Sequence, residues 1–403
     1  RWRRKHPEQA AAHDADLAGE AAAIEDDENI PERIRHAEPS GMTMTRAALY
    51  DERDVDQTVR QFRPITYGAM VEVAPGASAT FHDAGHILGS AIIELRVADG
   101  MTDGAAATTI AFSGDLGRCD TPILRDPTPI SHADFVLVES TYGNREHAAH
   151  DKAIAELVET IDQVAGDRGV LLVPSFAIGR TQELVWVLDE LLRDGRTPHL
   201  PLYLDSPMAS RASDVYLRHP DAYDAETAEL LRSGDSPLTY PGETYTNEVE
   251  QSKSIRTAAR PLMVVASSGM LTGGRIMHHL KDFLPDPACT LLFIGYQGEG
   301  TLGRHLQAGG RTARIDGEEY PVRCRVRSIS GFSAHADEHE LDDWLAHFTR
   351  AGGTNASDGR PKRVFVVHGD PDAATALAER IRRDLHLEAH VPSYRETAVL
   401  RSG

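Results

Sequence analysis

A change in the pattern of apolar residues near residue 143 constrains the fold of this chain more than any other feature. Before that point, short apolar runs alternate with glycine-rich corners, as in ASATFHDAGH and SAIIELRVADG, which predicts an antiparallel or mixed sheet. After it, strands alternate with amphipathic helices, which predicts an inserted unit with a parallel sheet. From about residue 326 the chain returns to a strand, a helix and a strand. The sequence therefore predicts an α/β protein whose first domain, 1–143 and 326–403, is interrupted by a second domain, 144–325.

Charge and cysteine content limit the classes of partner and the compartment. The 403-residue chain carries a formal net charge of −20, which argues against a broad basic surface for nucleic acid, so a polyanion would have to be bound locally. The three cysteines, Cys119, Cys289 and Cys324, are far apart, which indicates neither a disulfide framework nor a thiolate zinc site. No run approaches the ~18 apolar residues of a membrane helix. We therefore expect a cytoplasmic protein without a membrane partner.

Three apolar strands end in an acidic residue or a histidine close to a glycine. TTIAFSGD ends at Asp115, DFVLVESTYG contains Glu139, and RVFVVHGD contains His368. His86 lies in a glycine-bounded turn, DAGHILG. An acid after a single strand is more often a turn former or a helix cap. Strand ends of one sheet meet at one rim, however, and imidazole with carboxylate is a ligand set that zinc favours, so the four residues together are candidates for a zinc site.

The stretch SGFSAHADEHELDDWL places His335 at the start of a predicted helix. Asp337 and His339 follow it with H-x-D-x-H spacing, which is compatible with a metal cluster. Asp337 also fits the first turn of a helix, where the helix dipole favours an acid. We interpret Asp337 as such an acid and keep His335 as a candidate functional residue. Other histidines, including His147 and His279, show no comparable placement and are expected at the surface or in packing.

Several longer motifs occur in a fixed order. They are DAGHILGSA, FSGDLGR, VESTYGNR, VPSFAIGRTQE, DSPMA, ASSGMLTGGR, SGFSAHAD and VVHGD. In this order the motifs closely resemble the β-CASP branch of the metallo-β-lactamase-fold RNA-processing nucleases, over about residues 60–403. The resemblance implies a metallo-β-lactamase αββα sandwich with an inserted Rossmann-like β-CASP domain, two zinc ions, and RNA bound in the cleft between the domains.

The resemblance also implies roles for the candidate residues. His86, Asp115 and His368 match zinc ligands of the family, with Asp115 as the bridging ligand and a catalytic residue. Glu139 matches the acid that partners a family histidine, and His335 matches that histidine, which is our candidate donor of a proton to the departing 3′ oxygen. Relatives that act on DNA carry valine in place of His368, so the histidine favours RNA. The implied function is zinc-dependent hydrolysis of RNA phosphodiester bonds in RNA processing or decay, internally, from a 5′ end, or both.

Contacts with the RNA backbone are expected mainly from a glycine-rich loop. SSGMLTGGR follows an apolar strand and precedes a helix, so its N–H groups and Arg275 are candidates for binding an anion. A helix cap at Thr272 with a flexible turn explains the same residues without a ligand. The candidate substrate-binding residues are Ser267, Ser268, Gly273, Gly274 and Arg275 of this loop, Arg180 of GRTQE, and Ser333 of SGFSAHAD.

One motif of the family is missing. The zinc-binding sequence H-x-H-x-D-H does not precede His86, and His86, Asp115 and His368 cannot fill two zinc coordination shells by themselves. Because the chain begins with Arg1 and keeps the other site positions, we expect an N-terminally truncated fragment, inactive on its own, rather than a homologue that has lost its metals.

Other functions stay open on sequence grounds. A metal-deficient, non-catalytic RNA-binding subunit of a processing complex is the main alternative. GEGTLG, residues 298–303, satisfies the G-x-G-x-x-G pattern of dinucleotide-binding domains, although the helix after it is too short for that unit. A metallo-β-lactamase-fold hydrolase of small molecules would lack the inserted domain. A homodimer is left open as well.

Overall fold

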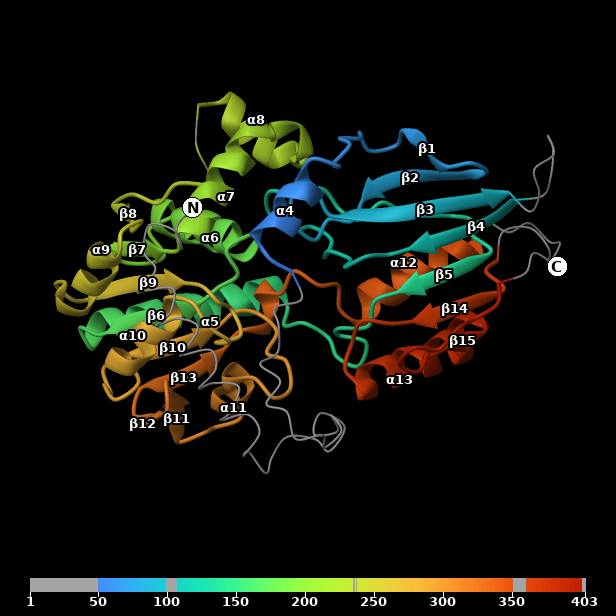
Figure 1. Ribbon diagram of the computed structural model, residues 1–403. Coiled ribbons are helices and arrows are strands. Elements are labelled where there is room, and N and C mark those ends of the chain that lie inside the picture. The colour runs from blue at the N-terminus through green and yellow to red at the C-terminus, as the bar shows by residue number, and fades with distance from the viewer. Residues whose placement is uncertain (1–49, 99–106, 235, 237, 351–359, 401–403) are drawn as a thin grey trace.

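The structure is a computed structural model that describes residues 50–98, 107–234, 236, 238–350 and 360–400. The expected first domain therefore lies partly outside the described residues, because these begin at Tyr50. Two large sheets lie side by side, each in its own domain (Figure 1). The chain leaves the first sheet after β5 (Phe135–Val138), builds the second, and returns after β13 (Arg325–Ser328). This is the interrupted α/β arrangement that the sequence predicts.

The first domain holds a mixed sheet of seven strands in the order β1-β2-β3-β4-β5-β14-β15. β1 to β4 pair antiparallel, and the pairs from β4–β5 onward are parallel. The other strands are β1 (Met70–Ala74), β2 (Ala77–Asp83), β3 (Ala91–Ala98), β4 (Ala107–Phe112), β14 (Arg363–Val366) and β15 (Ala389–His390). Ahead of them, α4 (Glu52–Val59) begins at a capping box formed by Asp51 and Asp54.

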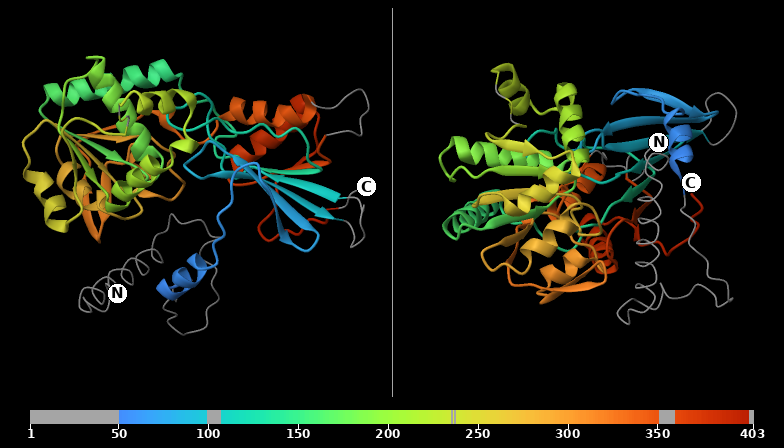
Figure 2. Two further views of the ribbon diagram at one scale, coloured as in Figure 1. Left: turned by 90° about the horizontal axis from the view of Figure 1, so that it is seen from above. Right: turned by 60° about the vertical axis from the view of Figure 1, so that its left-hand side comes forward.

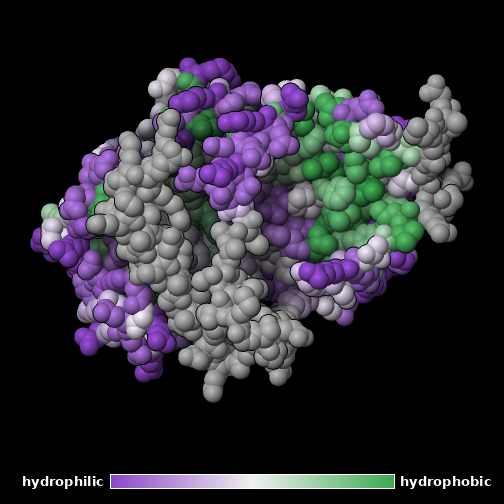
Figure 3. Space-filling model, in the orientation of Figure 1, coloured by the Kyte–Doolittle hydropathy of each residue, from purple (hydrophilic) through white to green (hydrophobic). Residues whose placement is uncertain are grey.

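Helices cover one face of this sheet in the described residues. α12 (Glu338–Arg350) and α13 (Pro371–Arg380) pack on the face that carries the buried Ile92, Val136 and Val364 (Figure 2). The opposite face carries apolar residues at paired positions of β2, β3 and β4, namely Phe81, Ile93, Leu95, Ile110 and Phe112. These five are only partly buried, and Figure 3 shows apolar side chains gathered over this part of the sheet. The described residues thus supply one sheet and one helical layer of an αββα sandwich.

The second domain is built on a parallel sheet of six strands in the order β13-β10-β6-β9-β7-β8. Its strands besides β13 are β6 (Val170–Pro174), β7 (Leu202–Asp205), β8 (Glu243–Tyr245), β9 (Leu262–Ala266) and β10 (Thr290–Phe293). Its helices are α5 (His150–Gly166), α6 (Arg180–Arg193), α7 (Pro207–Arg218), α8 (Ala225–Arg232), α9 (Val249–Ser254), α10 (Ile276–Phe283) and α11 (Leu302–Gln307). β11 (Thr312–Ile315) and β12 (Glu318–Pro321) form a separate antiparallel pair. β13 begins at the expected boundary, residue 325, and still belongs to this sheet.

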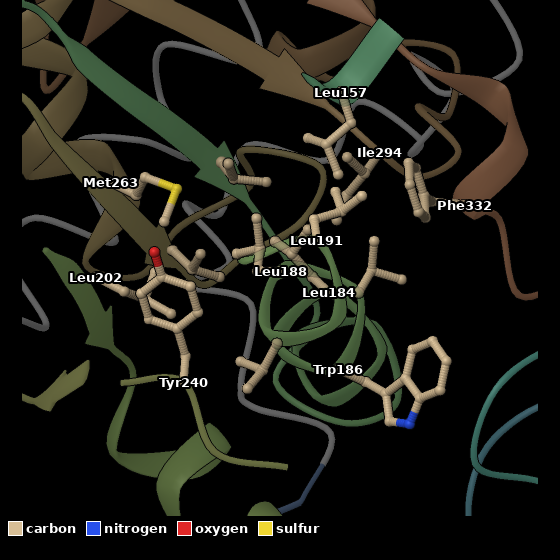
Figure 4. Close-up of a cluster of buried hydrophobic side chains, with 14 of the residues drawn as sticks. Leu157, Leu184, Trp186, Leu188, Leu191, Leu202, Tyr240, Met263, Ile294 and Phe332 are labelled. Carbon is tan, nitrogen blue, oxygen red and sulfur yellow. The ribbon is translucent and has the colours of Figure 1, made fainter. Parts of the chain in front are cut away.

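The core of the second domain lies between its sheet and the amphipathic helices. The apolar faces predicted for α5 and α6 are buried, with Leu157 from α5 and Leu184 and Leu188 from α6 packed against Met263 of β9 and Ile294 after β10 (Figure 4). The alternation of strand and helix in the sequence is therefore confirmed. None of the helices in the described residues is long and apolar enough to span a lipid bilayer.

Candidate active site

The ends of three neighbouring strands bring the predicted polar residues together. Asp115 follows β4, Glu139 follows β5 and His368 follows β14, and these strands are adjacent in the parallel half of the sheet. Parallel strands end at the same edge, so the apolar runs that form the strands also deliver their terminal polar residues to one place. The sequence predicted this convergence.

His86, Asp115 and His368 lie in direct contact range. Nε2 of His86 is 3.8 Å from one carboxylate oxygen of Asp115, and Nδ1 of His368 is 3.4 Å from the other. His335 joins them, because one ligand atom each of His86, Asp115 and His335 lie within 4.8 Å of one another. The side chain of Asp115 is 40% exposed, so a hydrated cation or a substrate can reach it.

The position of His86 depends on two close glycines. Gly85 adopts a φ of +67°, and a Cβ there would lie 2.8 Å from the carbonyl oxygen of Arg125. A Cβ on Gly117 would lie 2.1 Å from the carbonyl oxygen of Gly85, and the Gly117 N–H donates to Ala84 at 2.7 Å. The turn that carries His86 is therefore folded against the segment that follows Asp115, which explains why glycine precedes the histidine.

The chemistry of this donor set suits zinc. Burial, followed by the nearby His335 and Arg180 charges, lowers the pKa of His86 to about 4, so its imidazole is neutral and keeps a lone pair. Its Nδ1 is buried and has no hydrogen-bond partner among the described residues. Imidazole and carboxylate are ligands that zinc favours, and the two oxygens of Asp115 face His86 and His368 separately. Two complete zinc shells need more donors than these residues offer.

Glu139 and His335 form the second pair of the site. Glu139 is 1% exposed, and its carboxylate accepts from the N–H of Leu116 at 2.6 Å and of Thr141 at 3.3 Å. Burial opposes ionisation, but the hydrogen bond from His335 and the other donors outweigh it, so the pKa of Glu139 is lowered. An ionised carboxylate only accepts, and therefore Nδ1 of His335, 3.1 Å from both oxygens, is the donor. This leaves Nε2 as the nitrogen that His335 offers to a substrate.

His147 supports His335 through a main-chain contact that the sequence did not predict. Its Nε2 lies 2.9 Å from the carbonyl oxygen of His335, and burial as the main cause lowers the pKa of His147 to about 4. The neutral ring therefore donates to that carbonyl, and it packs edge-on against Tyr142 with ring centroids 4.4 Å apart. The expectation that His147 is a surface or packing residue agrees with this ring contact, but its hydrogen bond to the main chain of His335 was not predicted. Only its closeness in sequence to the VESTYGNR motif hinted at this position.

Arg180 and Ser333, both predicted to bind substrate, lie buried beside the site. Arg180 forms an ion pair with Glu183 and donates to the carbonyl oxygen of Phe332. Ser333 is 2% exposed, and its hydroxyl is 3.4 Å from the N–H of His335. These contacts join the two domains and shape the turn before His335, whereas the predicted contact with RNA stays a prediction.

The SSGMLTGGR loop closes on itself at the end of β9. The hydroxyl of Ser268 accepts from the N–H of Thr272 at 3.0 Å, and the hydroxyl of Ser267 contacts that of Ser206 at 3.0 Å. Gly274 has a φ of +83°, and a Cβ there would lie 2.3 Å from the carbonyl oxygen of Ser267. Helix α10 begins at Ile276 with Arg275 as its cap, so the alternative of a helix cap at Thr272 is wrong.

Arg275 is held inside the second domain. Its guanidinium donates to Asp205 at 2.6 Å and to the carbonyl oxygen of Thr246 at 2.7 Å. Asp205 is fully buried and also accepts from His279, whose Nε2 is 2.6 Å away, so His279 belongs to a buried hydrogen-bond network and not to the surface. The guanidinium N–H groups that Arg275 could offer to a phosphate thus mostly donate to these protein partners already. Its role in RNA binding stays a prediction.

The dinucleotide alternative fails on geometry. The helix after GEGTLG is α11 (Leu302–Gln307), which has six residues. A pyrophosphate-binding fingerprint requires a helix that continues through a complete βαβ unit. The glycine at position 303 instead approaches the carboxamide of Gln297, whose oxygen would lie 1.7 Å from an added Cβ. Gly303 therefore serves a close local contact, whereas Gly300 has a φ of +76° and open space around it.

Comparison with known proteins supports the same family. Residues 181–306 match the Beta-Casp domain, and residues 319–392 match the Zn-dependent metallo-hydrolase RNA specificity domain. The chain is 37% identical over 331 residues to ribonuclease TTHA0252 of Thermus thermophilus, covering 82% of this chain and 71% of that protein. It is 33% identical over 363 residues to transcription termination factor FttA of Pyrococcus abyssi, covering 88% of this chain and 53% of FttA. FttA of Methanosarcina mazei is 31% identical over 363 residues, covering 87% and 54%.

This chain therefore spans about half the length of the FttA proteins and more than two thirds of the Thermus ribonuclease. The first match falls on the inserted domain. The second begins there, covers β13, and continues through α12 and β14 of the first domain. With the ordered motifs and the rim of histidines and acids at the sheet edge, these similarities establish that the chain belongs to the β-CASP family of metallo-β-lactamase-fold RNA-processing nucleases.

Proposed function

We propose that the protein acts as a zinc-dependent ribonuclease that hydrolyses RNA phosphodiester bonds in RNA processing or decay. The observation that carries this proposal is the meeting of His86, Asp115 and His368 with the Glu139–His335 pair at one sheet edge. A binding module needs no ionised, buried carboxylate aimed at a histidine beside a potential metal site. The names of the relatives, a ribonuclease and a termination factor, support a role on RNA.

His86, Asp115 and His368 would hold the metal. Zinc bound there supplies a Lewis acid for a phosphate oxygen and lowers the pKa of a bound water. We propose two zinc ions per complete site, which requires an H-x-H-x-D-H segment in addition to these residues. The low pKa of His86 keeps its ring unprotonated at neutral pH, so binding a cation there does not first require loss of a proton.

His335 would give a proton to the departing 3′ oxygen from Nε2. Glu139 fixes the ring through Nδ1, and His147 fixes the main chain of the same residue. A positioned acid of this kind contributes roughly 10²- to 10⁴-fold to the rate. Asp115 has its carboxylate between His86 and His368 and would orient the reacting groups there.

The RNA would lie between the two domains. Our candidates for contacts with its backbone are the loop residues Ser267, Ser268, Gly273, Gly274 and Arg275, together with Arg180 and Ser333. Because the chain carries a net charge of −20, affinity must come from a few local contacts and not from a basic surface. We also propose the domain limits 1–143, 144–325 and 326–403, a cytoplasmic location, and a homodimer as the assembly to test by light scattering.

Zinc content and RNA cleavage test the proposed function together. A polypeptide that carries this sequence and an H-x-H-x-D-H segment should contain two zinc ions and cleave single-stranded RNA, with activity lost on chelation and restored by Zn²⁺. His335→Ala should retain zinc and lose cleavage. If the polypeptide binds RNA but contains no zinc and does not cleave, the alternative of a non-catalytic RNA-binding subunit is correct.

A further inference from the structure

The turn that carries His86 is held partly by its own domain. The hydroxyl of Ser90 accepts from the N–H of His86 at 3.1 Å and from the N–H of Ile87 at 3.2 Å. The Ser90 N–H in turn donates to the carbonyl oxygen of Ile87 at 2.9 Å. These bonds come from within the turn. The first domain also holds it, because the Gly117 N–H donates to the carbonyl oxygen of Ala84 at 2.7 Å and the Tyr67 hydroxyl donates to that of Ser90 at 2.8 Å.

The inserted domain contacts this turn directly. The hydroxyl of Tyr216, on α7, accepts from the N–H of Leu88 at 3.1 Å, across 128 residues of sequence. Gly179, the residue before α6, lies so close that an added Cβ would be 2.7 Å from Cγ2 of Ile87 and 3.9 Å from the Tyr216 hydroxyl. Tyr216 of α7 and Gly179, which precedes α6, therefore both meet the turn within two residues of His86.

Tyr216 is itself rigidly placed. It is 2% exposed and belongs to the apolar core of the inserted domain, and its carbonyl oxygen accepts from the hydroxyl of Tyr223 at 2.6 Å. A hydroxyl held by a packed ring is a fixed acceptor, unlike one on a mobile surface side chain. A small cavity lined by His86, Gly179, Arg180, Glu183 and Tyr216 adjoins the contact.

We infer that Tyr216 is a positioning residue for His86, through which the inserted β-CASP domain takes part in forming the metal site of the other domain. The inference rests on the proposed function, since it assigns His86 to a metal. Its physical content is that contact with the inserted domain adds to the order that the turn already has from contacts within its own domain. A change in domain contact therefore reaches the metal ligand through the Leu88 N–H and Tyr216 hydroxyl.

Hydrogen exchange tests the inference without metal. Tyr216→Phe removes the hydroxyl and keeps the ring, so we expect amide exchange in peptides covering residues 84–90 to become roughly tenfold faster. Tyr240→Phe is the matched control, because the Tyr240 hydroxyl is also buried and accepts a backbone N–H, that of Leu200 at 3.3 Å, within the inserted domain. Exchange in α5 reports global destabilisation. Unchanged exchange in the turn, or an equal rise in α5, overturns the inference.

Zinc affinity supplies a second readout. Competition with a chelating dye, using Zn²⁺ alone, should show roughly tenfold weaker binding for Tyr216→Phe and no change for Tyr240→Phe, as for loss of an outer partner of a metal ligand. Equal affinity of Tyr216→Phe and the unchanged protein overturns the positioning role. Both variants are therefore compared in a polypeptide that also carries an H-x-H-x-D-H segment. If that polypeptide without either substitution binds no Zn²⁺, the proposed function fails, and the exchange experiment alone decides the inference.

Discussion

Nδ1 of His335 lies 3.1 Å from both carboxylate oxygens of Glu139, although 196 residues separate them in sequence. The carboxylate comes from the end of β5 and the imidazole from the turn before α12, so the pair joins the segments that precede and follow the inserted domain. The isolated bridge between Gly117 and His335 places the same turn against the segment after β4. A single interruption of the first domain therefore separates, in sequence, residues that must act together.

Glu139→Gln should weaken both catalysis and folding. The N–H of Leu116 and Nδ1 of His335 now donate to carboxylate oxygens. The amide would place an N–H₂ group against one of these donors and would no longer orient the His335 ring in the same way. We expect cleavage to fall by about 10²- to 10⁴-fold and the free energy of unfolding to fall by about 1–3 kcal/mol. Single-turnover cleavage and urea unfolding measure the two effects. The double variant with His335→Ala should cleave no more slowly than His335→Ala alone, and additive losses would refute action as a pair.

The Asp205 network makes a separate prediction about acid stability. Burial would raise the pKa of Asp205, but hydrogen bonds from His279, Ser252, Thr246 and Arg275 outweigh it, so the pKa lies well below the ordinary 3.8. A carboxyl with a lowered folded pKa stabilises the fold above its unfolded pKa, and this contribution disappears as pH falls through the folded value.

Asp205→Asn should therefore lower the free energy of unfolding by about 3–5 kcal/mol at pH 7. The difference in unfolding free energy from the unchanged protein should stay constant down to about pH 5 and narrow below about pH 4. Asp286→Asn breaks a partly exposed pair with Arg260 and should cost less than about 1 kcal/mol. Urea unfolding at each pH measures this, and a loss for Asp205→Asn that is equal at pH 7 and pH 3 contradicts the assignment.

The sequence predicted the polar residues at the strand ends, but it did not predict the partners of His279 and His147. Asp115, Glu139 and His368 were recognisable because each follows an apolar strand, and parallel strands that are neighbours must end at one edge. His279 gave no such signal, since its partner Asp205 lies 74 residues away and the contact depends on how α10 packs beside β7. His147 was missed for the same reason. Side chains of helices and loops meet through tertiary packing, which periodicity within one segment does not encode.

Gly117→Ala should disturb the site by steric overlap. The added Cβ would lie 2.1 Å from the carbonyl oxygen of Gly85 and 2.7 Å from the nitrogen of His86, so the His86 turn must move. We expect a loss of about 1–3 kcal/mol of unfolding free energy, as for overpacking, and weaker zinc binding. Gly166→Ala is the control, because no atom lies within 4 Å of its added Cβ, and it should change stability by about 1 kcal/mol or less. Equal effects of the two variants would contradict the close approach.

The two faces of the first sheet should respond differently to substitution at neighbouring positions of β3. Ile92 is fully buried beneath α12 and α13, whereas Ile93 points to the opposite, apolar face and is only partly buried. Ile92→Ala should lower the free energy of unfolding by about 2–5 kcal/mol, and Ile93→Ala by about 1 kcal/mol or less.

A contiguous exposed apolar patch also binds hydrophobic dyes and favours association. Ile93→Thr combined with Leu95→Thr should therefore reduce anilinonaphthalene sulfonate fluorescence while the β3 pairing survives, since threonine suits a strand. Dye binding that persists in this variant, or equal costs at positions 92 and 93, would show that the second face is covered by other parts of the chain.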